Sequence, residues 1–302
     1  MKLSMESMFS GLDRGWKNLH WTCGLSDCQN KLFMRSVPQS CVGIRMGETW
    51  YCSMDCFVKA TRHQLSVLTC IRSIDMPHTP RASIGSVMLS KGYLTDKELR
   101  GAVAESRLNG EALENTLVRL GLVDEWHLAS ARAIQWGYPV LGRDRISQSV
   151  DTDLPLSLIK TFSAAPLHYS KSAKRILMGF VYRVEHSLLQ SLEQVTGCRT
   201  EPCFITPTEL HYQMERLEAA RESREVVLES SMTSAEMANV VGGLALEITA
   251  RDASLSRCRD QVWMRLAGRR RMIDVLIRGR RPGVARKCDT FVASEEGMRA
   301  AG

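Results

Sequence analysis

Two stretches of the chain share one pattern, and this repeat restricts the fold more than any other feature of the sequence. LSKGYLTDKEL, residues 89–99, is followed by VRLGLVDEWHL, residues 118–128, so that Gly92 matches Gly121. Each glycine stands where a helix should end in a left-handed residue, and a residue able to cap the next helix follows it. Residues 83–136 are therefore expected to form four short helices, arranged as two helix–glycine–helix hairpins.

A second pattern consists of two cysteine pairs near the N-terminus. WTCGLSDC contains Cys23 and Cys28, and TWYCSMDC contains Cys52 and Cys56. Nothing in the sequence directs export to an oxidising compartment, so such pairs are interpreted first as metal ligands. Zinc takes about four soft ligands at the corners of a tetrahedron, and two short cysteine loops can supply them.

The order of these ligands along the chain is similar to that of treble-clef zinc fingers. GIRMGETWYCS predicts a hairpin that turns at Gly47, and Cys56 falls in the first turn of a helix through FVKATRHQL. No His, Glu and water arrangement accompanies the cysteines, so a filled site would be closed and structural. The alternatives are buried reduced thiols, and a site in which Cys41 replaces one of the ligands.

The middle of the chain changes its hydrophobic period. APLHYS and KRILMGFVY are strand-like, EHSLLQSLEQVTG is typical of a helix ending at Gly197, RTEPCFI is a third strand, and TPTELHYQMERLEAA is a helix. Strands separated by helices imply a small α/β sandwich.

The C-terminal part is expected to begin after a charged linker around Glu218 to Glu229. Thr233 and Glu236 can cap a helix that runs to about Thr249. ASLSRCR, QVWMRLA and RRMIDVLI then predict a three-strand meander with turns at RD and GR.

These patterns together predict an α+β multidomain protein with a small zinc-binding module, a four-helix repeat subdomain, a small α/β sandwich and a C-terminal helix plus β-meander. The expected boundaries are a four-cysteine zinc-finger-like module at 1–70, a linker at 71–82, the helical repeat subdomain at 83–141, the α/β subdomain at 142–220, the helix plus meander at 232–278, and a basic, disordered tail at 279–302.

The repeat region resembles the N-terminal domain of type II secretion and type IV pilus assembly ATPases, the MshE-type or GspE N-terminal domain. Members of that family with two intact copies of the pattern RLGxxLLxxGLIxxxxLxxxLxxQ bind cyclic di-GMP. The resemblance therefore implies ligand-binding residues at the positions that keep the pattern, which are Gly85, Leu89, Gly92, Leu99, Gly121, Leu128 and Gln135.

Both copies also depart from this pattern. The first has Ser83 for Arg and Ser106 for Gln, and the second has Ala112 for Arg, Glu114 for Gly and Arg132 for Leu. A bisphosphate ligand needs cations and close backbone approach, whereas Glu114 adds a negative charge where a glycine would admit the ligand. We therefore expect a degenerate cyclic di-GMP motif whose remaining leucines and glycines pack two helix hairpins.

The enzymatic part of these ATPases is not expected here. The sequence contains no G-x-x-x-x-G-K-[ST] phosphate-binding loop and no Gly-Lys pair. We expect no catalytic activity, and the resemblance implies an adaptor or regulatory protein whose partner is a component of the secretion or type IV pilus machinery.

Charge supports one alternative function. The net charge is +7, but residues 265–287 hold nine basic residues and one acidic residue, a net +8, which leaves a net −1 for the rest of the chain. The alternative is thus a zinc-dependent nucleic-acid-binding protein that uses its basic C-terminal segment. The longest apolar run, ILMGFVY, is far too short to span a bilayer, and no signal-like apolar region opens the chain, so we expect a cytoplasmic protein without a membrane span.

Overall fold

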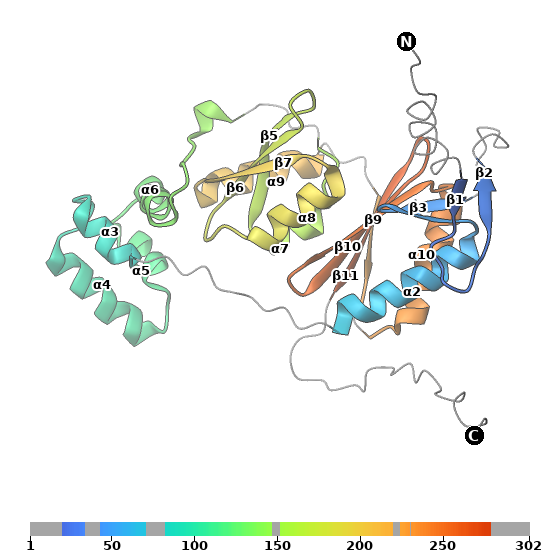
Figure 1. Ribbon diagram of the computed structural model, residues 1–302. Coiled ribbons are helices and arrows are strands. Elements are labelled where there is room, and N and C mark those ends of the chain that lie inside the picture. The colour runs from blue at the N-terminus through green and yellow to red at the C-terminus, as the bar shows by residue number, and fades with distance from the viewer. Residues whose placement is uncertain are drawn as a thin grey trace, which may run out of the picture.

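A computed structural model describes residues 20–33, 43–70, 82–146, 152–219, 224–229 and 231–278 (Figure 1). These residues form a helical repeat, a three-stranded sheet with helices, and a six-stranded sheet with helices. The mixed α+β fold class predicted from the sequence is confirmed. In the described part of the chain, no helix combines the length and the apolar character that crossing a lipid bilayer requires.

The helical repeat has the four predicted helices. They are α3 (Ile84–Ser90), α4 (Asp96–Asn109), α5 (Leu113–Arg119) and α6 (Glu125–Trp136). Gly92 and Gly121 follow α3 and α5 with φ of 69° and 66°, the left-handed conformation that glycine adopts without strain. Thr95 and Glu98 form a capping box at the start of α4. Local signals therefore mark the turns after α3 and α5 and the start of α4.

The α/β subdomain is a three-stranded sheet of order β5-β6-β7. Its elements are α7 (Leu156–Thr161), β5 (Ala164–Ser170), β6 (Arg175–Phe180), α8 (His186–Thr196), β7 (Arg199–Phe204) and α9 (Pro207–Ala219), and the short 3-10 helix η2 (Arg143–Arg145) precedes them. Alternate residues of β6 pack on opposite faces: Ile176 and Met178 share a core with α8, and Leu177 shares one with Leu210 of α9. The sandwich is as predicted, except that α7 was not expected.

The six-stranded sheet joins segments from both ends of the described chain. Its order is β4-β3-β9-β10-β11-β8, formed by β3 (Ile44–Met46), β4 (Thr49–Tyr51), β8 (Arg224–Leu228), β9 (Asp252–Cys258), β10 (Gln261–Ala267) and β11 (Met272–Arg278). The N-terminal strand β3 pairs in parallel with β9, with Arg45 opposite Asp252 and Met46 opposite Ala253. The cysteine-rich segment and the C-terminal meander, predicted as separate domains, thus share one sheet.

Both faces of this sheet are covered. Helices α2 (Met54–Cys70) and α10 (Ser234–Glu247) lie side by side over one face (Figure 1). Val262 and Met264 of β10 point into this core, whereas Trp263 between them packs on the opposite face in a core with Leu188 of α8. Alternate side chains of β10 therefore pack the sheet against the α/β subdomain on one face and against helices α2 and α10 on the other.

One prediction between the subdomains was wrong. The segment from Glu218 to Glu229 was expected to be a charged linker, but Arg224–Leu228 form β8, the edge strand that pairs in parallel with β11. Val226 and Val227 are β-branched and suit a half-buried edge position. The predicted tail 279–302 and nearly all of the linker 71–82 lie outside the described residues.

Candidate metal centre and degenerate repeat

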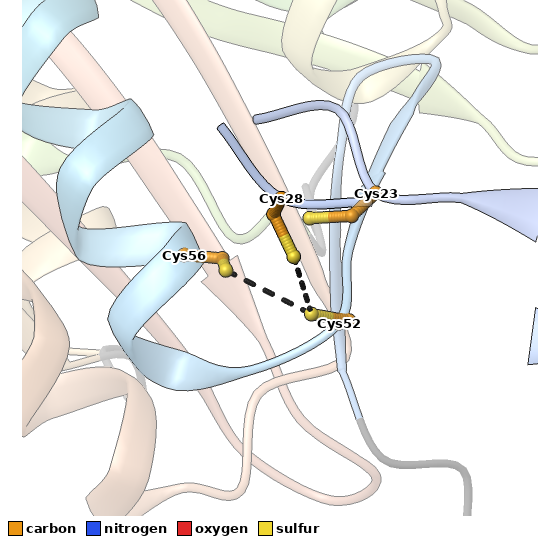
Figure 2. Close-up of side chains that lie close together, drawn as sticks. All are labelled: Cys23, Cys28, Cys52 and Cys56. Atoms are coloured by element: carbon orange, nitrogen blue, oxygen red, sulfur yellow. Dashed lines mark hydrogen bonds between the residues drawn. The ribbon is translucent and has the colours of Figure 1, made fainter. Parts of the chain in front are cut away.

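Four cysteine side chains point toward one another at the edge of the six-stranded sheet (Figure 2). The Sγ atoms of Cys23, Cys28, Cys52 and Cys56 all lie within 4.8 Å of one another. Cys52 Sγ is 3.6 Å from Cys28 Sγ and 3.7 Å from Cys56 Sγ. A zinc ion with Zn–S bonds of about 2.3 Å has sulfur–sulfur edges of ~3.8 Å, whereas a disulfide bond is about 2.05 Å long. The spacing fits a tetrahedral thiolate site and excludes disulfides between these pairs.

The first two ligands lie on a tight loop after β1 (His20–Thr22). The Cys28 N–H donates to the Leu25 carbonyl at 2.9 Å, which closes the turn that brings Cys28 back toward Cys23. The Gly24 N–H donates to the Trp50 carbonyl of β4 at 2.8 Å. The loop is thereby fixed to the hairpin whose end carries the second pair.

The loop approaches β4 closely at Gly24. A Cβ built there would lie 1.9 Å from Thr49 Cγ2, well inside any allowed contact. A side chain at residue 24 would therefore force Thr49 to move, so glycine suits the close approach of the loop to β4.

The second pair spans the junction of β4 and α2. Cys52 follows β4, and Cys56 lies in the first turn of α2, where its N–H donates to Ser53 Oγ at 3.2 Å. The predicted hairpin, the predicted helix and the position of Cys56 are all confirmed.

The chemistry of this donor set suits a soft, closed metal site. Cys23 and Cys52 are buried, and within the described residues no carboxylate or imidazole belongs to the cluster. Burial raises the pKa of the Cys52 thiol to about 12, so the metal-free thiol is neutral at ordinary pH and a bound cation must displace its proton. Four sulfur ligands leave no open position for a substrate.

The structure brings together the four cysteines that the sequence selected as metal ligands. The alternative ligand Cys41 lies outside the described residues. Cys198, Cys203 and Cys258 are buried elsewhere, and Cys70 is the last residue of α2. The geometry is thus compatible with zinc.

Several of the candidate nucleotide-binding residues have packing roles in the repeat. Leu128 is buried in the core of the helical repeat, and Leu89 and Leu99 pack against that core. A Cβ at Gly85 would lie 3.1 Å from Leu99 Cδ1, so this glycine lets α4 approach α3. Gln135 Nε2 donates to the Ala82 carbonyl at 2.7 Å and links α6 to the start of α3. That these residues bind a nucleotide stays a prediction.

Two departures from the repeat pattern meet in space. Arg132 Nη2 lies 3.8 Å from Glu114 Oε1, although the two residues are on different helices of the second copy. Arg132 is only 5% exposed, and its Nη1 donates to the Val181 carbonyl at 2.7 Å. Its guanidinium also lies 5.2 Å from the centroid of the Tyr182 ring. A cation that replaces an expected leucine therefore fixes α6 to the α/β subdomain.

Comparisons with known proteins find similarity over less than half of the chain. No protein-family model matches it. The type IV pilus assembly ATPase PilB of Thermus thermophilus is 29% identical over 135 residues, which are 44% of this chain and 15% of PilB. The chain contains a region related to secretion and pilus assembly ATPases. This agrees with the family resemblance predicted from the repeat.

Two solved structures cover a similar share of this chain. A structure of MshE with cdg has 19% sequence identity and a TM-score of 0.38, and covers 45% of this chain and 99% of the MshE chain. The N-terminal domain of XpsE has 23% identity and a TM-score of 0.34, and covers 44% of this chain and 92% of its own. This chain spans a small part of PilB but nearly all of the chains in these two structures.

The Glu114–Arg132 pair was missed by sequence reasoning. The two residues were interpreted as independent losses of ligand contacts. Both positions depart from the family pattern in the same copy, and they carry opposite charges. This combination is the feature of the sequence that could have indicated an ion pair.

Proposed function

We propose that this chain is a non-catalytic, cytoplasmic adaptor or regulatory protein of a type IV pilus or type II secretion assembly. The observation that carries the proposal is the 29% identity to PilB over 135 residues. The sequence has no G-x-x-x-x-G-K-[ST] loop to hold nucleotide phosphates, so this chain does not itself act as a motor. It contributes a docking domain of the ATPase type to another component of the assembly.

Zinc, in this proposal, is a structural cofactor held by Cys23, Cys28, Cys52 and Cys56. The sulfur–sulfur distances of 3.6 and 3.7 Å support it, since they approach the edge of a zinc–thiolate tetrahedron. The ion would join the first cysteine loop to the β3–β4 hairpin, and through that hairpin to the C-terminal sheet.

The repeat has, in our proposal, lost its affinity for cyclic di-GMP and kept its packing. The ligand-binding pattern of the family is only partly present in this sequence. Glu114 and Arg132 replace the glycine and leucine of that pattern, and Arg132 pairs with both Glu114 and the Val181 carbonyl. Ligand binding at these positions would have to break an ion pair whose arginine is buried, and leave the Val181 carbonyl without its donor.

Three measurements on the purified full chain test this function. Metal analysis should give one zinc per chain, calorimetric titration with cyclic di-GMP should give no heat, and an assay of phosphate release should show no ATP hydrolysis. Biolayer interferometry against purified components of the pilus or secretion assembly of the same organism should give saturable binding to one of them. ATP turnover, or no binding to any component, would contradict the adaptor proposal.

A further inference from the structure

A cavity beneath the turn between β10 and β11 has the features of an anion site. It has a volume of about 530 Å³, within the range of roughly 300–1,000 Å³ that small-molecule sites occupy. We propose that this cavity binds a small, multiply charged phosphate compound through Arg270 and Arg271. The proposal is independent of the adaptor function and of the metal centre.

The turn that carries the arginines is rigid. The Gly268 N–H donates to the Arg271 carbonyl at 2.9 Å, which closes the turn between the two strands. A Cβ at residue 268 would lie 2.3 Å from the Ile248 carbonyl oxygen, so the turn rests directly against the end of α10. Three consecutive arginines, 269 to 271, are thus presented on a fixed backbone, which lowers the entropy cost of binding.

The charges around the cavity favour an anion. Its lining includes four arginines and two acids, which are Arg224, Arg269, Arg270, Arg271, Asp153 and Glu247. Arg224 forms an ion pair with Glu247, so these two charges cancel. With Asp153 and the three arginines of the turn, the lining as a whole carries a net charge of +2. Across the part of the chain that the structure describes, no ion pair involves Arg270 or Arg271, and both side chains are exposed.

The geometry of guanidinium selects the class of ligand. Arginine presents a planar fork of donors that matches the oxygens of a phosphate group, and adjacent arginines favour two or more negative charges. The same cavity has an apolar wall that includes Ile248 and Met272. A phosphate compound with a modest organic group would satisfy both parts of the lining.

Calorimetric titration of the full chain with inorganic pyrophosphate tests the anion part directly, and adenosine diphosphate and adenosine test the organic part. We expect binding of both phosphates and none of adenosine. The double variant Arg270→Gln/Arg271→Gln should bind pyrophosphate at least about tenfold more weakly, since one lost charge-assisted hydrogen bond already accounts for that factor. Arg270→Lys/Arg271→Lys keeps the charge but loses the fork, and should be intermediate.

The control is Arg62→Gln/Arg107→Gln, which removes the same charge from two exposed positions on α2 and α4. It should bind pyrophosphate within about twofold of the parent chain, because neither arginine lines the cavity and salt screens exposed charges. Equal losses in the two glutamine pairs, or no heat with millimolar pyrophosphate, would overturn the proposal. Binding of mixed-sequence DNA with no binding of pyrophosphate would overturn it in favour of a nucleic-acid surface.

Discussion

Replacing Cys52 by serine should reduce zinc affinity and destabilise the six-stranded sheet as a whole. Cys52 is buried, and its Sγ lies 3.6 and 3.7 Å from the Sγ atoms of Cys28 and Cys56. It is therefore placed centrally among the four ligands. A serine hydroxyl is a poor zinc ligand at neutral pH because it is not ionised and is not a soft donor.

The size of the effect follows from the number of ligands. Structural zinc sites contribute roughly 10–16 kcal/mol at neutral pH, or about 3 kcal/mol for each of four thiolates. Loss of one ligand should then weaken zinc binding about 150-fold. By linkage, the zinc-dependent part of the free energy of unfolding falls by up to the same ~3 kcal/mol, which lowers Tm by roughly 6–12 °C in a domain of this size.

The measurement combines zinc competition with a chromophoric chelator and thermal unfolding of zinc-loaded protein. Cys203→Ser is the matched control, since Cys203 is equally a buried thiol but lies in the α/β subdomain, where it donates to the Met178 carbonyl at 3.5 Å. It should leave zinc affinity unchanged. Hydrogen exchange should also report the difference: Arg45 and Gly47 donate to the carbonyls of Arg251 and Ala253, and their amides should lose protection only in the Cys52 variant.

The reasoning would be refuted by Cys52→Ser protein that binds one zinc with the affinity of the parent chain. It would equally be refuted if the parent chain, purified without chelator and supplied with zinc, bound none. Either result would return the cluster to the alternative of four reduced, buried thiols.

Three further predictions concern the same loop and the repeat. Gly24→Ala should destabilise the protein by ~1–3 kcal/mol through its clash with Thr49 Cγ2, and Thr49→Ser should rescue it in chemical denaturation, because the next atoms lie at 3.4 and 3.5 Å. Arg132→Leu alone should lower the free energy of unfolding by ~1–3 kcal/mol, and the double variant Glu114→Gly/Arg132→Leu should lower it by less. The double variant should also give measurable heat when it is titrated with cyclic di-GMP. Absence of this heat would argue against the degenerate motif. Because the pKa of metal-free Cys52 is raised to about 12, zinc must displace a proton from this thiol, and zinc affinity should rise with pH between about 6 and 8. Calorimetric titration in buffers of different ionisation enthalpy should detect the protons that binding releases.

Local signals explain why so much of the fold was predictable. The helix boundaries at Gly92 and Thr95 depend on a left-handed turn and a capping box within a few residues of sequence. The meander was predictable because three strand-like runs are separated by short turns at RD and GR. The grouping of the cysteines was predictable because each pair is closely spaced in the sequence and a predicted hairpin lies between the pairs, and the structure brings the four side chains together.

Long-range pairings could not be predicted in the same way. Arg45 of β3 and Asp252 of β9 are joined by an ion pair at 2.6 Å across 207 positions, and no feature near either residue indicates the other. β8 was missed because it is a short edge strand between charged residues, and its pairing with β11 depends on tertiary contacts. The same holds for Arg132, whose carbonyl partner Val181 belongs to another subdomain.

These long-range contacts connect the metal centre to the repeat. The cysteine loop is hydrogen-bonded to β4, and β3 of the same hairpin pairs with β9. Strand β9 pairs in turn with β10, whose Trp263 packs against the α/β subdomain. From that subdomain, the Val181 carbonyl holds Arg132 of α6. If these contacts form one cooperative unit, chelation of zinc should lower the exchange protection of α6 amides as well as those of β9. Loss confined to β3, β4 and α2 would show instead that the metal stabilises only its own segment.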